Sequence, residues 1–230
     1  LGDVYKRQVG TIFTHGDPQS NLNNQLAGVD LNLRSSNWWN EQSVSWHGFY
    51  MTSDDENENS DDVIGTHFTF PNYPFRASGH WVRTGENFNP ALGFVRRRGG
   101  ESTGLGFTYY FEQPENELLE DISVGAEYDR YEWLDGDLDS DELEINLIGI
   151  RTLAGDFLGL EVEFERDILQ EPFEIIDEVI IPSSEYKGID FELEFRSSSN
   201  RPVFGEFEIA YGHFYGGKAT NAEIDLSWRP

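Results

Sequence analysis

The chain has 230 residues and a formal net charge of −27, with 43 Asp and Glu against 16 Lys and Arg. This acid excess disfavours nucleic acid and anionic membrane surfaces as partners, because both attract proteins through Lys and Arg. Cysteine is absent, which excludes disulfides and thiolate sites, and an aromatic content of 14% argues against intrinsic disorder.

The first eight residues differ in kind from the rest of the chain. Residues 1–8, LGDVYKRQ, resemble translated sequencing adapter, so we interpret them as an artefact and expect the chain to be a fragment. The sequence of interest is therefore 9–230, which we interpret as a single domain.

From Val9 onward the dominant sequence period is two. In 157–166, FLGLEVEFER, the apolar residues Leu158 and Leu160 alternate with Gly159 and Glu161, and the alternation continues to the end of the segment. Strand residues alternate sides, so this pattern predicts a strand that is apolar on one face and anionic on the other. No helical period is present. Strands are expected at 9–14, 26–34, 43–52, 63–70, 75–83, 101–111, 119–132, 139–151, 157–168, 185–196, 203–212 and 219–229.

The connections between these segments alternate in length. Those at 15–25, 53–62, 85–100 and 169–184 are long, whereas those at 71–74, 112–118, 153–156 and 197–202 are short. Long loops that alternate with short turns are typical of an outer-membrane β-barrel, whose strands need roughly 9–11 residues to cross a bilayer. The predicted fold is therefore all-β, an antiparallel up-and-down transmembrane β-barrel of about twelve strands. A soluble antiparallel sandwich with a solvated acidic face is the alternative.

In the barrel interpretation the apolar faces contact lipid and the acidic faces line the lumen. An acidic lumen favours cations over anions. The predicted lumen-lining residues are Glu127, Glu142, Glu144, Glu161, Glu163, Glu165, Asp190, Glu192, Glu194, Glu206, Glu208, Glu223 and Asp225.

Several strings resemble one bacterial family, in the same order along the chain. They are VGTIFTHGDP (9–18), LAGVDLNLR (26–34), GENFNPALGFVRRRG (85–99), EPFEI (171–175), VIIPSSEYKG (179–188) and GHFYGG (212–217). The family is the uncharacterised C-terminal outer-membrane β-barrel domain that follows a family-nine-type carbohydrate-binding module in Gram-negative bacteria. Its most distinctive loop corresponds to Asn87, Phe88, Asn89, Pro90, Arg96, Arg97 and Arg98.

The resemblance implies a location in the bacterial outer membrane, contact with its lipid bilayer, and a role near carbohydrate. It implies no catalytic residues. The chain carries no upstream carbohydrate-binding module and ends in Trp228-Arg229-Pro230 rather than in an aromatic residue, so we expect an incomplete barrel that lacks further strands.

Two motifs are weighed as chemical sites. Residues 100–104, GESTG, match the G-x-S-x-G nucleophile elbow, but strand alternation begins directly after them, so we interpret them as the entry to a strand. Clustered acids suit Ca²⁺, which prefers oxygen ligands. The spacing at 135–142 departs from an EF-hand loop, so a solvated hairpin tip is favoured over a calcium site and no other cofactor is expected. That calcium site would use Asp135, Asp137, Asp139 and Asp141.

The remaining polar residues do not select a reaction. The five histidines show no metal-ligand spacing, and we expect the basic cluster 96–98 to pair with acids inside the protein. Three functions therefore stay open: a barrel of a surface carbohydrate-binding or uptake system, a barrel-anchored carbohydrate-active hydrolase, and a soluble acidic β-sandwich that acts as a binding module.

Overall fold

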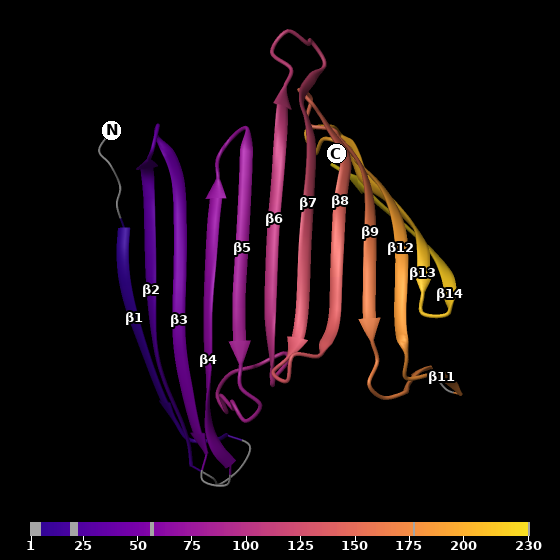
Figure 1. The fold of residues 1–230 in the computed structure, drawn as a ribbon. Coiled ribbons are helices and arrows are strands. Elements are labelled where there is room, and N and C mark those ends of the chain that lie inside the picture. The colour runs from indigo at the N-terminus through magenta and orange to yellow at the C-terminus, as the bar shows by residue number, and fades with distance from the viewer. Residues whose placement is uncertain (1–5, 19–22, 56–57, 177, 230) are drawn as a thin grey trace. The chain divides into compact units, whose positions relative to one another are not determined.

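The computed structural model describes residues 6–18, 23–55, 58–176 and 178–229, and every regular element in these ranges is a β-strand (Figure 1). Twelve strands form one sheet in which chain neighbours are hydrogen-bonded neighbours, apart from the insertion of a separate hairpin, β10–β11, between β9 and β12. The strands are β1 (Lys6–His15), β2 (Asn24–Trp38), β3 (Gln42–Asp55), β4 (Glu58–Pro71), β5 (Phe75–Thr84), β6 (Gly100–Glu112), β7 (Leu119–Trp133), β8 (Leu138–Thr152), β9 (Phe157–Ile168), β10 (Phe173–Ile176), β11 (Val179–Ile181), β12 (Glu185–Arg196), β13 (Val203–Phe214) and β14 (Gly217–Trp228).

The predicted up-and-down antiparallel sheet is confirmed. All twelve expected strands are present, and β9 and β12 have the expected bounds. Two predicted loops are wrong. Most of 53–62 belongs to β3 and β4, and 169–184 contains the β10–β11 hairpin, which has a register shift between Glu174 and Ile176. Of the predicted adapter artefact, residues 1–5 lie outside the described residues, whereas Lys6 to Gln8 pair with Arg34 to Asn32 of β2.

The chain divides into two compact units. Unit 1 comprises Leu1–Asn72, Ala77–Leu105 and Arg130–Leu138, and unit 2 comprises Tyr73–Arg76, Gly106–Asp129 and Asp139–Pro230. The expectation of one domain over 9–230 stays a prediction. In unit 1 the buried core is small and consists of Leu26, Val63 and Phe88.

On strand β12 of unit 2 the apolar side chains are more exposed to solvent than the acidic side chains that alternate with them. On β12 the apolar residues are the exposed ones: the exposed fractions are 43% for Ile189, 50% for Phe191 and 42% for Phe195. The alternating Glu192 and Glu194 are half-buried. On β12 the acidic side chains are thus better covered than the apolar ones, which is the opposite of a strand in an ordinary soluble sheet.

The β12–β13 pairing leaves no room for a side chain at one glycine. A Cβ atom at Gly212 would lie 1.8 Å from Oδ1 and 2.6 Å from Cα of Asp190 on the neighbouring strand. We predict that Gly212→Ala lowers the free energy of unfolding by about 1–3 kcal/mol, because the strands must separate. The measurement is urea unfolding followed by tryptophan fluorescence. Gly216→Ala is the control, because a Cβ atom added there would meet no heavy atom within 4 Å apart from its chain neighbours. Equal unfolding midpoints for the two variants would contradict the prediction.

Candidate functional site

Acidic side chains line one face of β8, β9, β12, β13 and β14 in unit 2. Glu163 of β9 pairs directly with Glu144 on one side and with Asp190 on the other. Directly paired residues of neighbouring strands point to the same face, so these three carboxylates form a row. The other direct pairs on this face are Glu142–Glu165, Glu161–Glu192, Glu194–Glu208, Glu208–Glu223 and Glu206–Asp225.

We call the residues of these rows the acidic face. It gathers all the predicted lumen acids of β8 to β14, and Glu127 of β7 lies near enough to Glu142 for the two charges to interact. Arg196 relieves the repulsion at one end, where its Nε donates to Glu206 at 3.1 Å and its guanidinium also contacts Glu194. Like charges directly opposite one another destabilise a sheet, so cations near the remaining rows lower the energy of this face.

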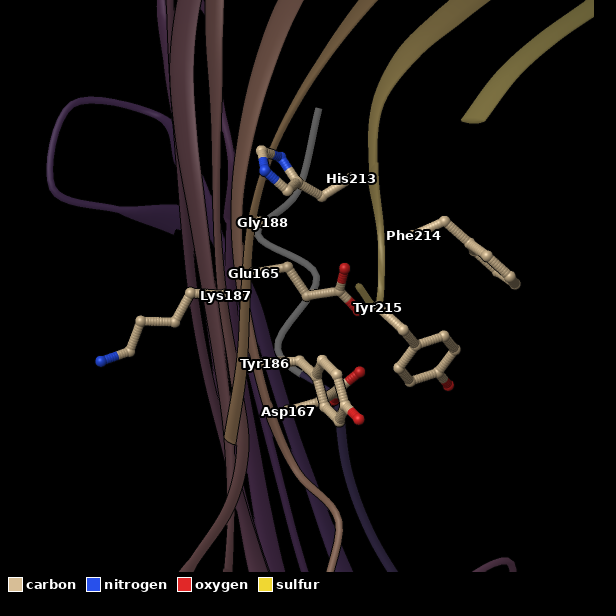
Figure 2. Close-up of a pocket in the computed structure, with 8 residues that line it drawn as sticks. All are labelled: Glu165, Asp167, Tyr186, Lys187, Gly188, His213, Phe214 and Tyr215. Carbon is tan, nitrogen blue, oxygen red and sulfur yellow. The ribbon is translucent and has the colours of Figure 1, made fainter. Parts of the chain in front are cut away.

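A small pocket lies where β9, β12 and β13 meet (Figure 2). Glu165 and Asp167 come from β9, Tyr186 from β12, and His213 and Tyr215 from the end of β13 and the turn after it. Figure 2 shows Lys187 pointing away from the other side chains, as strand alternation requires. We call this site the Tyr186 pocket. Its cavity volume of about 100 Å³ suits one small polar group rather than a whole drug-sized ligand.

Aromatic rings fix one wall of the Tyr186 pocket. The ring of Tyr215 makes edge-to-face contacts with Tyr186 at 5.2 Å and with Phe173 of β10 at 5.4 Å between centroids. The Tyr186 hydroxyl donates to the Pro182 carbonyl at 2.9 Å. Burial, with Asp167 and Glu165 nearby, raises the pKa of the Tyr215 phenol. The site therefore presents carboxylates, an imidazole and a neutral phenol, which can accept and donate hydrogen bonds to hydroxyl or ammonium groups.

An ion pair ties two turns of unit 2 together. The Arg201 guanidinium binds Asp156 through two nitrogens, one of them at 2.6 Å from Oδ2. The backbone amide of Ser198 donates to Asp156 Oδ1 at 2.8 Å, and the Asp156 amide donates to Thr152 Oγ1 at 3.0 Å. The Arg201 hydrogen bond and the Ser198 amide hold the pKa of the Asp156 carboxyl below its usual value of 3.8.

In unit 1 the loop 85–99 folds onto the face of β2, β3 and β4. Its Phe88 side chain is only 3% exposed and packs against Leu26 and Val63. Three polar strand residues bind the loop backbone. Asn24, itself 1% exposed, donates from Nδ2 to the Asn89 carbonyl at 2.8 Å; the Asn89 amide donates to Ser53 Oγ at 2.8 Å; and the Asn87 amide donates to Asp61 Oδ2 at 3.0 Å.

Two arginines of this loop contact neighbouring side chains of unit 1, and the expected pairing of 96–98 with acids stays a prediction. Arg98 donates to Asn89 Oδ1 at 2.9 Å, and Arg97 lies over the Tyr131 ring, 4.8 Å from its centroid. Both contacts brace the loop within unit 1. Pro90 borders the cavity beneath the loop, and Arg96 is exposed.

Three histidines that are far apart in the sequence form a row on unit 1. His47 of β3 and His67 of β4 are direct cross-strand partners with ring centroids 6.0 Å apart, and His67 stacks on His80 of β5 at 5.7 Å. Phe49, which shares a face of β3 with His47, stacks on both His47 and His67. Sequence reasoning missed this row. The signal that could have found it is the placement of the histidines at like positions of three predicted strands.

The motifs weighed as chemical sites have other roles. Gly100 to Gly104 begin β6, as expected, and Ser102 Oγ lies 3.2 Å from His80 Nε2 without the strand-to-helix turn of a nucleophile elbow. Asp141 of the calcium candidate accepts hydrogen bonds from Arg166, and Asp135 accepts from the Asp137 amide at 3.0 Å. Within the described ranges, no group of three or more His, Asp or Glu residues, Asp139 included, is arranged to hold a metal ion.

The described residues also contain no helix with the length and apolar character needed to cross a membrane. Comparison of the chain with known protein families, curated proteins and solved structures finds no match. The family resemblance therefore stays a prediction.

The ion pair between Asp156 and Arg201 predicts a pH dependence of stability. The Asp156 pKa is lower in the folded state, so its contribution is present above pH 3.8 and is lost as the pH falls through the folded-state value. We predict that Asp156→Asn unfolds at lower urea than the unmodified chain at pH 6, and that this difference narrows in acid. Urea unfolding at both pH values tests it, with Glu115→Gln in an exposed turn as the control. A difference independent of pH would contradict the assignment.

We expect the two hydrogen bonds between the buried Asn24 side chain and the loop backbone to hold loop 85–99 against the sheet. Asn24→Ala leaves the Asn89 carbonyl and the Ala91 amide without this side-chain partner, at a cost of about 1–3 kcal/mol. Trypsin should then cleave after the exposed arginines 96–98 about tenfold faster, because the loop opens more often. Asn32→Ala is the control, since Asn32 is an exposed residue of the same strand. Equal cleavage rates for both variants would show that Asn24 does not hold the loop.

Proposed function

We propose that this protein is a transmembrane β-barrel of the bacterial outer membrane whose acidic face lines an aqueous interior. One observation carries the proposal: along β12 the large apolar side chains are exposed while the alternating acids are half-buried. Water penalises an exposed apolar strand face, whereas lipid favours it. Carboxylates on the other face remain in water, where their charge is least costly.

Strand length and aromatic placement support the same proposal. Strands β7 and β8 have 15 residues each, enough for a tilted crossing with ends in the interface. Exposed aromatic side chains on several strands, among them Trp46, Tyr50 and Trp228, are the residue types that form interfacial belts. Closure requires β1 and β14 to gain a second hydrogen-bonded neighbour, since each has one among the described strands.

The role that we propose for the barrel is in a surface carbohydrate-binding or uptake system. The carbohydrate part rests on the family resemblance. The Tyr186 pocket is compatible with it, because Glu165, Asp167 and His213 beside aromatic rings can bind hydroxyl groups. The acidic face adds a preference of the interior for cations and neutral solutes over anions.

Labelling of neighbouring residues on β12 tests the proposal. The chain has no cysteine, so Phe191→Cys and Glu192→Cys each give one site for a nitrobenzoxadiazole fluorophore. After reconstitution into phosphatidylcholine vesicles, we expect lipid-attached nitroxide to quench the label at 191. The label at 192 should be quenched by aqueous Tl⁺ more strongly than by iodide, because the acidic face concentrates cations.

The two sites control for each other because they are adjacent in the sequence and point to opposite faces. Quenching of both labels by iodide, with none by lipid nitroxide, would show a water-exposed sheet and support the soluble binding module. Equal quenching of the label at position 192 by Tl⁺ and by iodide would contradict the proposed cation preference of the interior, but it would not contradict the membrane location.

A further inference from the structure

A cavity of about 340 Å³ lies between loop 85–99 and strands β1 to β5, at residues of unit 1. Well-packed protein interiors contain few voids larger than a water molecule, whereas small-molecule sites span about 300–1,000 Å³. The space beneath the loop therefore has the volume of a small-molecule site. Its lining residues belong to unit 1, whereas the acidic face and the Tyr186 pocket belong to unit 2.

The apolar lining departs from the strand pattern of the rest of this face. On β2 the alternation places Leu26 on the same face as Asp30, and on β3 it places Met51 on the same face as His47. Apolar side chains thus lie at positions of this face that the loop covers, between Asn24 and Asp30 on β2 and between His47 and Ser53 on β3. Because a solvated face does not require apolar side chains at these positions, the lining is suited to an apolar occupant.

Gly28 of β2 and Gly65 of β4 have no side chains, so the lining side chains of adjacent strands lie over their backbone. A Cβ atom at Gly28 would lie 2.5 Å from Cγ of Met51 and 3.0 Å from a methyl of Ile12. The hydrogen bonds from Asn24 and Ser53 hold the loop backbone in place, so the loop does not collapse into the space beneath it. The site is therefore preformed, which lowers the entropic cost of binding.

The polar groups at the cavity specify an uncharged ligand. Among the described residues, its lining contains no ionisable side chain, and its hydroxyls come from Thr14 and Thr84. Moving a charge into such surroundings without a partner is strongly unfavourable. A neutral molecule with one hydroxyl or carbonyl can bond to a threonine while its apolar part fills the space.

We propose that this cavity binds a small neutral molecule with an alkyl or aryl group, held between loop 85–99 and the strand residues Leu26, Met51 and Val63. The exposed apolar residues Leu92 and Phe94 of the loop, 57% and 87% exposed, border the entrance. The inference is independent of the proposed function, because the cavity exists whether the opposite face of the sheet contacts lipid or water.

Met51 provides a specific reporter, since it is the single methionine of the sequence. In protein labelled with [methyl-¹³C]methionine and measured in parallel in aqueous buffer and in lipid nanodiscs, we expect 1-hexanol to shift the Met51 methyl resonance saturably. Hexanoate and hexylammonium should bind about tenfold more weakly, because their charges lose hydration. Nuclear Overhauser contacts between hexanol and the Met51 methyl in the unmodified chain give a second readout that needs no variant.

Two adjacent substitutions complete the test. Val63→Phe fills the cavity and should abolish saturation, whereas Ile64→Phe, at an exposed residue on the opposite face of β4, should retain it. A shift that stays linear in hexanol, or saturation retained in Val63→Phe, would overturn the site. Equal binding of hexanoate would overturn the ligand class. None of these results depends on the fluorophore quenching that tests the membrane assignment.

Discussion

The antiparallel register between neighbouring strands is the constraint on which the other features of this protein depend. A strand places successive side chains on opposite faces, so fixing one cross-strand pair fixes the face of every residue in both strands. The pairing of Glu163 with Asp190 sets Phe164 and Ile189 together on the other face. A slip of one residue would place glutamates opposite phenylalanines. The acidic face and the exposed apolar face are therefore two consequences of one register.

Most of the fold could be predicted from the sequence because its signal is local. Alternation alone located twelve strands, and for β9 and β12 it also located both ends. It failed at 53–62, where Asp, Asn and Ser suggested a loop although β3 and β4 continue through most of the segment. There, the cross-strand pairing of Ser53 with Asp61 outweighs the weak intrinsic strand preference of these residues. The β10–β11 hairpin was missed because its strands are too short to show a period.

The candidate sites also differ in whether a local sequence pattern or the pairing of distant strands creates them. Alternation within one strand sets the face on which each acidic side chain lies, so the sequence predicted most members of the acidic face. The cross-strand partner of each acid depends on the register between strands, which the sequence did not show. The histidine row needed it too, because His47, His67 and His80 come together only through the β3–β4–β5 order. Loop 85–99 was distinctive as a sequence, but nothing local indicated that Phe88 would be buried or that Asn24 would bind Asn89.

Loop 85–99 packs against the strands of unit 1 because the side chains beneath it include the apolar residues Leu26 and Val63. Covering the acidic rows of unit 2 would remove carboxylates from water, and the Coulombic repulsion between them would rise as the dielectric falls. Covering Leu26 and Val63 instead removes apolar surface from water, which is favourable. The polar strand residues at that end, Asn24, Ser53 and Asp61, each find a backbone partner on the loop. A loop therefore docks stably where it covers apolar side chains and where each polar side chain beneath it finds a partner on the loop backbone.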